Sequence, residues 1–168
     1  MYADAVLIAL GSSLEGQFGS SKALLDAALE AFPSSGLRVL QHSSWWRSAS
    51  WPDPSLPGYL NGIALVETAL APEEVLRALK GLEVRFGRGD GARNAPRTLD
   101  LDLIAHGRAV LSRSDLILPH PRAAERLFVM GPLAEIAPDW VHPVLGETAQ
   151  VLAAKASVGA DARPYVAA

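Results

Sequence analysis

Apolar and polar positions recur with periods that change along the chain, and these periods predict a succession of strands and helices. The apolar run at 5–10 ends in a glycine and predicts a buried strand followed by a tight turn. From 20 to 32, apolar residues recur at helical spacing up to Pro33, which predicts a helix over 20–32. Two extended stretches follow, beginning at Leu37 and Tyr59, with a proline-rich loop between them.

The second half of the chain predicts another helix, another strand and shorter helical pieces. A helix is expected from Pro72 to about Phe86, because a proline opens it, two glutamates fill its first turn and apolar residues follow one face. A loop rich in glycine and arginine leads into 97–107, where the residues alternate as in a strand. Helical pieces around 124–138 and 147–155 follow, and the last dozen residues, rich in alanine, are expected to fray.

This order of elements is a βαββαβ pattern. It predicts an α+β fold, specifically a ferredoxin-like βαββαβ sandwich with a C-terminal extension. The 168 residues contain no internal repeat and no long linker, so a single domain over residues 1–168 is expected. Unrelated activities share this plan, and the fold alone therefore does not assign a function.

Composition and charge narrow the class of protein. The formal net charge of −3 offers no general attraction to nucleic-acid backbones. The absence of cysteine excludes disulfides and thiolate metal sites and agrees with a reducing compartment. The sequence has no export signal and no apolar run approaching the ~20 residues that cross a bilayer. We therefore expect a cytoplasmic protein that binds neither nucleic acid nor membrane, with a monomer as the default.

Two aspartates stand out in the predicted strand over 97–107. Asp100 and Asp102 share one strand face, roughly 6–7 Å apart, while leucines fill the other face. Carboxylates this close repel each other, and both stay ionised only beside a cation such as Mg²⁺ or beside arginines. On spacing alone, a magnesium site and ion pairs with Arg93 or Arg97 on a wet sheet face are equally possible. The arginine-rich loop favours the former, because guanidinium groups suit the phosphate oxygens of a nucleoside triphosphate.

Two familiar phosphate motifs do not account for this loop and strand. The glycine spacing at 11–16 matches a P-loop, but Gln17 and Phe18 stand where Lys and Ser or Thr are required. The glycines at 87–92 follow a predicted helix, whereas a dinucleotide fingerprint follows a strand. Both readings are rejected.

Several motifs together resemble a known family. They are "RTLDLDL", "LPHPR", "PLAEIAP", "GSSL" and "SSWWRSASW" followed by "PGYLN", and they run in order from about Val6 to Pro143. The chain is similar to the 6-hydroxymethyl-7,8-dihydropterin pyrophosphokinases of folate biosynthesis. The resemblance implies transfer of pyrophosphate from ATP to the hydroxymethyl oxygen of the pterin, with release of AMP, on a ferredoxin-like fold.

The resemblance also implies roles for individual residues. Asp100 and Asp102 match the positions that hold two magnesium ions between the triphosphate and the attacking hydroxyl, and Arg88 and Arg97 match the catalytic, phosphate-contacting arginines. Further nucleotide-binding positions are matched by Glu83, His120 and Arg126. The pterin pocket is matched by Gly11, Ser48, Ala49, Trp51, Tyr59, Asn61 and Phe128.

Departures from the family pattern leave two alternatives open. Ser48-Ala49 replaces the usual threonine-proline, and Asp90 stands where a basic residue is common, so a catalytically silent relative that keeps the pterin pocket is one alternative. The other is a ferredoxin-like RNA-binding module. That module needs exposed aromatic residues on the strand where this chain carries aspartates.

Overall fold

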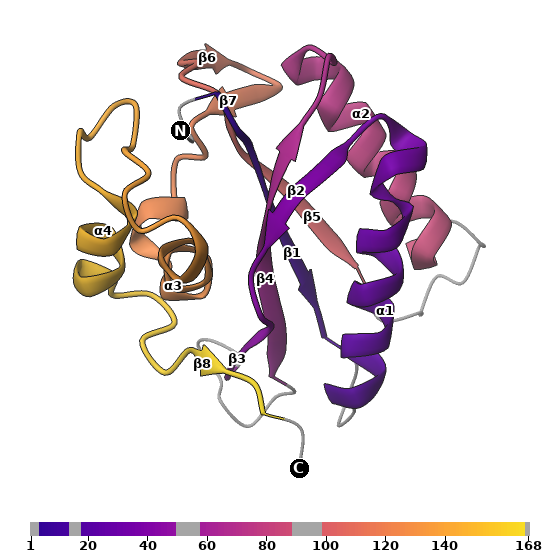
Figure 1. Cartoon of the computed structure of the whole chain (residues 1–168), viewed down its shortest axis with the longest axis horizontal. Coiled ribbons are helices and arrows are strands. Elements are labelled where there is room, and N and C mark those ends of the chain that lie inside the picture. The colour runs from indigo at the N-terminus through magenta and orange to yellow at the C-terminus, as the bar shows by residue number, and fades with distance from the viewer. Residues whose placement is uncertain (1–3, 14–17, 50–57, 89–98, 167–168) are drawn as a thin grey trace.

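An antiparallel sheet between two helical layers organises the computed structural model, which describes residues 4–13, 18–49, 58–88 and 99–166. Helices α1 and α2 cover one face of the sheet, and α3 and α4 lie on the other (Figure 1). The helices are α1 (Phe18–Ala31), α2 (Pro72–Glu83), α3 (Leu127–Ile136) and α4 (Ala149–Lys155), with single turns η1 (Phe32–Ser35), η2 (Val84–Arg88) and η3 (Ala123–Glu125). The strands are β1 (Val6–Ser12), β2 (Arg38–His42), β3 (Trp46–Ser48), β4 (Tyr59–Glu67), β5 (Asp100–His106), β6 (Leu111–Arg113), β7 (Leu116–Leu118) and β8 (Arg163–Pro164). The predicted α+β class is confirmed, and the strands of the sheet pair antiparallel.

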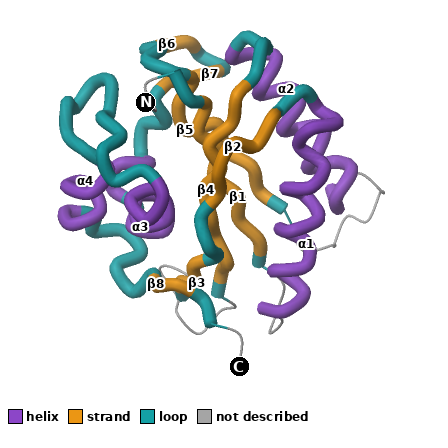
Figure 2. Tube along the Cα trace, viewed as in Figure 1, coloured by secondary structure: helices purple, strands orange, loops and turns teal. Residues whose placement is uncertain are grey.

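The order of strands brings three predicted site residues onto neighbouring positions. The sheet runs β5-β1-β4-β3-β8, and β2 also pairs with β4 (Figure 2). Strand β1 pairs on both sides, so that Gly11 lies opposite Asn61 of β4 and opposite Asp100 of β5. Asp102 lies opposite Ala9 on the same pair of strands. The end of β1 therefore lies between β5, the acidic strand that carries Asp100 and Asp102, and β4, which carries Asn61.

Two apolar cores lie on the two faces of the sheet. Leu101 and Leu103 point into the core that α1 and α2 cover. Ile104 of β5 and Leu7 of β1 belong to the second core, which α3 and α4 cover. An RNA-binding module leaves one sheet face open for stacked bases. Here α3 packs on that face.

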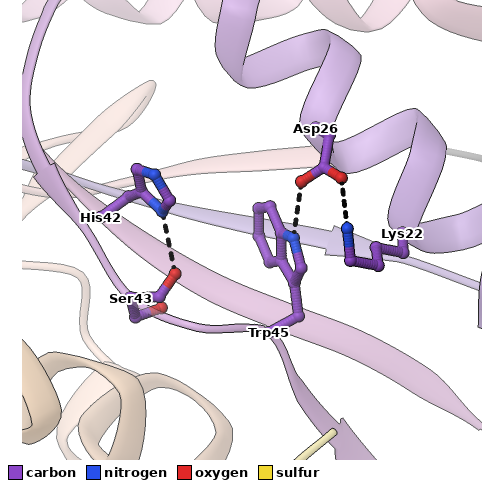
Figure 3. A network of polar contacts seen from close by, with 5 residues as sticks. All are labelled: Lys22, Asp26, His42, Ser43 and Trp45. Carbon is purple, nitrogen blue, oxygen red and sulfur yellow. Dashed lines mark hydrogen bonds and ion pairs between the residues drawn. The ribbon is translucent and has the colours of Figure 1, made fainter. Parts of the chain in front are cut away.

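Trp45, between β2 and β3, ties the strands to α1. Its indole N–H donates to the Asp26 carboxylate at 2.9 Å, and Lys22 contacts the other carboxylate oxygen at 2.7 Å (Figure 3). Its ring occupies the space that a side chain at Gly62 would need, since a Cβ there would lie 2.5 Å from the indole. Burial alone would raise the pKa of Asp26, but the hydrogen bonds from Lys22 and Trp45 hold it below its usual value. The contacts fix the chain just before β3, which lines the site described below.

The structure differs from the predicted elements where the strands are short or where a helix ends. The stretch from Leu37 divides into β2 and β3, and the β6–β7 hairpin was not predicted, because strands of three residues show almost no periodicity. Helix α2 was predicted to reach about Phe86. It is α-helical only to Glu83, and one π-helical turn, η2, follows it up to Arg88. The last dozen residues were expected to fray, but β8 pairs with β3 and the Tyr165 N–H donates to the Trp45 carbonyl at 2.8 Å.

Across the described ranges, no helix combines the length and apolar character needed to span a bilayer.

Candidate active site

The acidic side chains of β5 lie at the junction of two cavities. Asp100 and Asp102 line both the first cavity, of about 530 Å³, and the second, of about 430 Å³. Asp102 is exposed and Asp100 is half-buried, while Leu101 and Leu103 between and beside them are buried. The strand alternation thus anchors β5 in the core and presents its carboxylates to both cavities.

Most of the predicted pterin-binding residues line the first cavity. Tyr59 and Asn61 come from β4, and Phe128 comes from the start of α3. The ring of Phe128 lies under the Arg126 guanidinium, whose central carbon is 5.8 Å from the ring centroid. The cavity is completed on this side by the predicted residues Gly11, Ser48 and Ala49. Aromatic faces and an amide therefore surround one space.

Gly11 makes room for the Asn61 amide. A Cβ at position 11 would lie 2.8 Å from the Asn61 side-chain oxygen, closer than real Cβ atoms approach. The two residues face each other in the β1–β4 ladder. A glycine at position 11 is therefore required for the amide to keep this position.

The second cavity lies on the other side of the two carboxylates. It is bounded by the end of α2 and by the β6–β7 hairpin. Besides the two aspartates, its charged or titratable lining residues are Lys80, Glu83, Asp115 and His120. Lys80 brings a positive charge to the same cavity. An elongated ligand that reaches from one cavity into the other passes Asp100 and Asp102.

Two hydrogen bonds hold the acidic strand from its open side. The Leu101 N–H, between the two aspartates, donates to the Glu83 carboxylate at 2.8 Å. The backbone N–H of His120 donates to the Ile104 carbonyl at 2.8 Å. An edge strand has backbone groups without a ladder partner. Glu83 and His120, both predicted as nucleotide-binding residues, thus also fix the strand.

The imidazole of His120 has a lowered pKa. Burial lowers its pKa below the usual value, the Asp102 carboxylate opposes this shift, and the positive charges of Arg126 and Arg122 add to it. Its Nδ1 atom accepts the Arg122 N–H at 3.2 Å. This contact fixes the ring orientation beside the second cavity.

The donor set fits magnesium better than a metal that needs a full protein cage. No group of three or more His, Asp or Glu side chains with metal-binding geometry occurs among the residues described. Magnesium typically takes one or two carboxylates and completes its shell with water and phosphate oxygens. Asp100 and Asp102, open to two cavities, offer such an incomplete set.

Three predicted site residues are not described with their side chains. Trp51 and Arg97 lie outside the described residues, and Arg88 is described only as the last backbone position of η2. Their predicted roles stay predictions. The other eleven predicted site residues have the positions given above.

Several lining residues were not predicted from the sequence. Arg122 and Glu125 line the first cavity. Arg122 belongs to the "LPHPR" motif, so the sequence did contain a signal that could have identified it as a site residue. Val158 and Gly159 also line it, far along the chain, where the sequence shows no motif. Lys80 and Asp115 line the second cavity and look like ordinary surface charges in the sequence.

Comparison with protein families decides the relationship. Residues 7–138 match the model of the 7,8-dihydro-6-hydroxymethylpterin-pyrophosphokinase (HPPK) family. This chain belongs to the HPPK family. The resemblance noted in the sequence is confirmed over the part of the chain that carries β1 to α3.

Individual HPPK relatives extend the match. A 2-amino-4-hydroxy-6-hydroxymethyldihydropteridine pyrophosphokinase of Synechocystis is 46% identical over 113 residues, which is 67% of this chain and 57% of that protein. The protein of the same name from Pseudomonas aeruginosa is 36% identical over 159 residues, 95% of this chain and 96% of its own length. A "Folic acid synthesis protein fol1" of Pneumocystis carinii is 38% identical over 143 residues, 85% of this chain but 19% of that protein. The chain thus spans much less than the full length of some relatives.

Solved HPPK structures share the fold. A crystal structure of a Plasmodium falciparum HPPK-DHPS triple mutant superposes with a TM-score of 0.72 over 90% of this chain and 44% of that chain, at 12% sequence identity. At this identity the similarity concerns the fold alone.

Proposed function

We propose that this chain transfers pyrophosphate from ATP to the hydroxymethyl group of 6-hydroxymethyl-7,8-dihydropterin and releases AMP, a step of tetrahydrofolate biosynthesis. The observation that carries the proposal is the position of Asp100 and Asp102 on the border of two cavities. A reaction between a flat alcohol and a triphosphate needs two binding spaces that meet where the hydroxyl reaches the phosphate. The family relationship supports the same substrates.

The first cavity suits the pterin. A pterin is a flat heterocycle with polar edges, and Tyr59 and Phe128 provide aromatic surfaces while Asn61 provides an amide. The Asn61 side chain can both donate and accept, as the ring edge requires. The hydroxymethyl group would then extend toward Asp100 and Asp102, which line the same cavity.

The second cavity suits the nucleotide. Lys80, Glu83 and His120 line it. By correspondence with the family we assign Glu83, Arg88 and Arg97 to the nucleotide and its phosphates, together with Arg126, which lines the first cavity beside Phe128. In the transfer, the hydroxyl oxygen forms a bond to the β-phosphorus, the bond from that phosphorus to the oxygen shared with the α-phosphate breaks, and AMP leaves. The hydroxyl proton passes to solvent. Arginines beside the transferred group offset its negative charge.

We assign Asp100 and Asp102 as the ligands of magnesium, with two ions expected. Bound magnesium would neutralise phosphate charge and lower the pKa of the attacking hydroxyl. The carboxylates have fixed places because β5 is held by the core on one face and by the Glu83 hydrogen bond at its edge.

The arrangement of the sheet and helices also bears on the fold type. The strand order β5-β1-β4 with β2 and β3 beside β4, and helices α1 and α2 on one face, supports a ferredoxin-like plan. We further propose one domain, a monomer, and a cytoplasmic location.

The test is to identify the nucleotide product. The purified chain is mixed with ATP, Mg²⁺ and 6-hydroxymethyl-7,8-dihydropterin, and AMP and ADP are separated by chromatography. We expect AMP in step with pterin consumption, and none without the pterin or the metal. Stoichiometric ADP would refute pyrophosphoryl transfer. Pterin binding without any nucleotide product would favour the silent relative.

A further inference from the structure

Residues 157–165, named here the C-terminal segment, connect two walls of the first cavity. At one end the Val158 N–H donates to the Glu125 carbonyl at 2.9 Å, beside the start of α3. At the other end β8 pairs with β3, and the Tyr165 N–H donates to the Trp45 carbonyl at 2.8 Å. Figure 1 shows β8 beside β3, with the preceding chain coming from α4. The segment is thus tied to both elements that border the cavity.

Gly159 determines where the Phe128 ring rests. A Cβ at position 159 would lie 2.5 Å from Cδ1 of Phe128, so the ring occupies the space that a side chain would take. The φ angle of Gly159 is +68°, which side chains rarely adopt. Val158 and Gly159 both line the first cavity. The backbone of the segment is therefore the surface against which the Phe128 ring packs.

Asp161 contacts the wall of the first cavity that β3 and Ala49 form, across from Phe128. Its carboxylate accepts the Ala49 N–H at 2.7 Å. Ala49 follows the end of β3, where Ser48 pairs with Tyr59, and all three residues line the first cavity. A hydrogen bond to a charged acceptor is stronger than a neutral one. The position of the Ala49 backbone thus depends on a side chain more than one hundred residues later in the chain.

We propose that the C-terminal segment positions the pterin-binding wall, with Gly159 and Asp161 as positioning residues that act through Phe128 and Ala49. The inference rests on the proposed function, because it assigns the first cavity to the pterin. The family match ends at residue 138, so the segment lies beyond the matched part. The residues that line the second cavity do not include any of the segment. Loss of the Asp161–Ala49 hydrogen bond therefore weakens pterin binding and leaves nucleotide binding unchanged. Displacement of the Phe128 ring also disturbs Arg126, which we assign to the nucleotide.

The experiment compares Asp161→Ala with Asp161→Asn and with Arg163→Ala, a matched change at an exposed position of β8. KM values for pterin and ATP are measured, and pterin is titrated by its fluorescence in the presence of a nonhydrolysable ATP analogue and Mg²⁺. We expect Asp161→Ala to raise the pterin KM and Kd about tenfold, as for one hydrogen bond to a charged group, with the ATP KM unchanged. Asn keeps an oxygen acceptor, so Asp161→Asn restores most of the affinity, and Arg163→Ala binds as wild type.

Gly159→Ala provides an independent variant, because its Cβ would displace the Phe128 ring. It is also expected to weaken pterin binding, while circular dichroism verifies that each variant is folded. Wild-type pterin affinity in both Asp161→Ala and Gly159→Ala would overturn the inference, and so would equal losses for ATP and pterin in Asp161→Ala. An Asp161→Asn variant as weak as Asp161→Ala would overturn the hydrogen-bond basis. If the wild type bound pterin but formed no AMP, the proposed function would fail while the titration still tested the positioning role.

Discussion

Replacing Glu83 by alanine tests how the acidic strand is held. Glu83 is buried, with 8% of its surface exposed, and its carboxylate accepts the Leu101 N–H at 2.8 Å. Leu101 lies between Asp100 and Asp102, so this bond fixes the backbone that carries both carboxylates. Alanine removes the acceptor and leaves a buried N–H without this partner.

The structure gives the size of the effect. Leaving a buried donor unsatisfied costs about 2 kcal/mol of the free energy of unfolding. For a chain of 168 residues, this corresponds to a decrease of about 4–8 °C in Tm. Glutamine has the same shape and retains an oxygen that can accept the Leu101 N–H, so Glu83→Gln is expected to lose less than half as much.

Thermal denaturation followed by circular dichroism measures the difference. Arg77→Ala, an exposed change on the same helix, is the control and should shift Tm by less than about 2 °C. In the AMP assay, Glu83→Ala should also lower kcat, because the carboxylates lose their fixed backbone. A Glu83→Ala protein that melts with the wild type would refute the bracing role of this bond.

Two further predictions concern other buried contacts. Gly11→Ala should raise the pterin KM about tenfold, because the new Cβ displaces the Asn61 amide. The control Gly81→Ala has open space around its Cβ and should leave the pterin KM unchanged. Equal pterin KM values in the two variants would contradict this prediction. His142 is buried and accepts the Val144 and Leu145 N–H groups at Nδ1, and burial lowers its pKa below 6.5. Stability from the neutral ring is therefore complete above about pH 6.5 and is lost as the pH falls through the lowered folded-state value. Between pH 7 and 5, Tm should fall more steeply for wild type than for His142→Asn, and parallel curves would argue against it.

Elements with strong periodicity could be predicted from the sequence. The alternation of leucine and aspartate around Asp100 specified a strand with one buried face, and the structure has β5 there. The proline and two glutamates at the start of α2 specified its first turn, where Pro72 begins the helix. These signals are local, because each depends on residues within one or two turns of the chain.

Features that depend on tertiary contacts could not be predicted. The role of Glu83 as a hydrogen-bond acceptor for β5 depends on where α2 ends beside that strand. The alanine-rich end of the chain has a weak local pattern, yet Asp161 and Gly159 contact residues that are far away in the sequence. One contact is a hydrogen bond from a backbone N–H to the Asp161 carboxylate, and the other is the packing of a ring against Gly159. Neither produces a periodic pattern in the sequence.

The most direct test of the central claim is a crystal structure of the chain with Mn²⁺ in place of Mg²⁺, a nonhydrolysable ATP analogue and the pterin alcohol. Anomalous scattering locates the metal independently of the ligands. We predict manganese bound to the carboxylates of Asp100 and Asp102, the triphosphate beside it, and the pterin hydroxymethyl oxygen facing the β-phosphorus. Both ligands ordered in their cavities, with the metal bound elsewhere and the two carboxylates without it, would contradict the account.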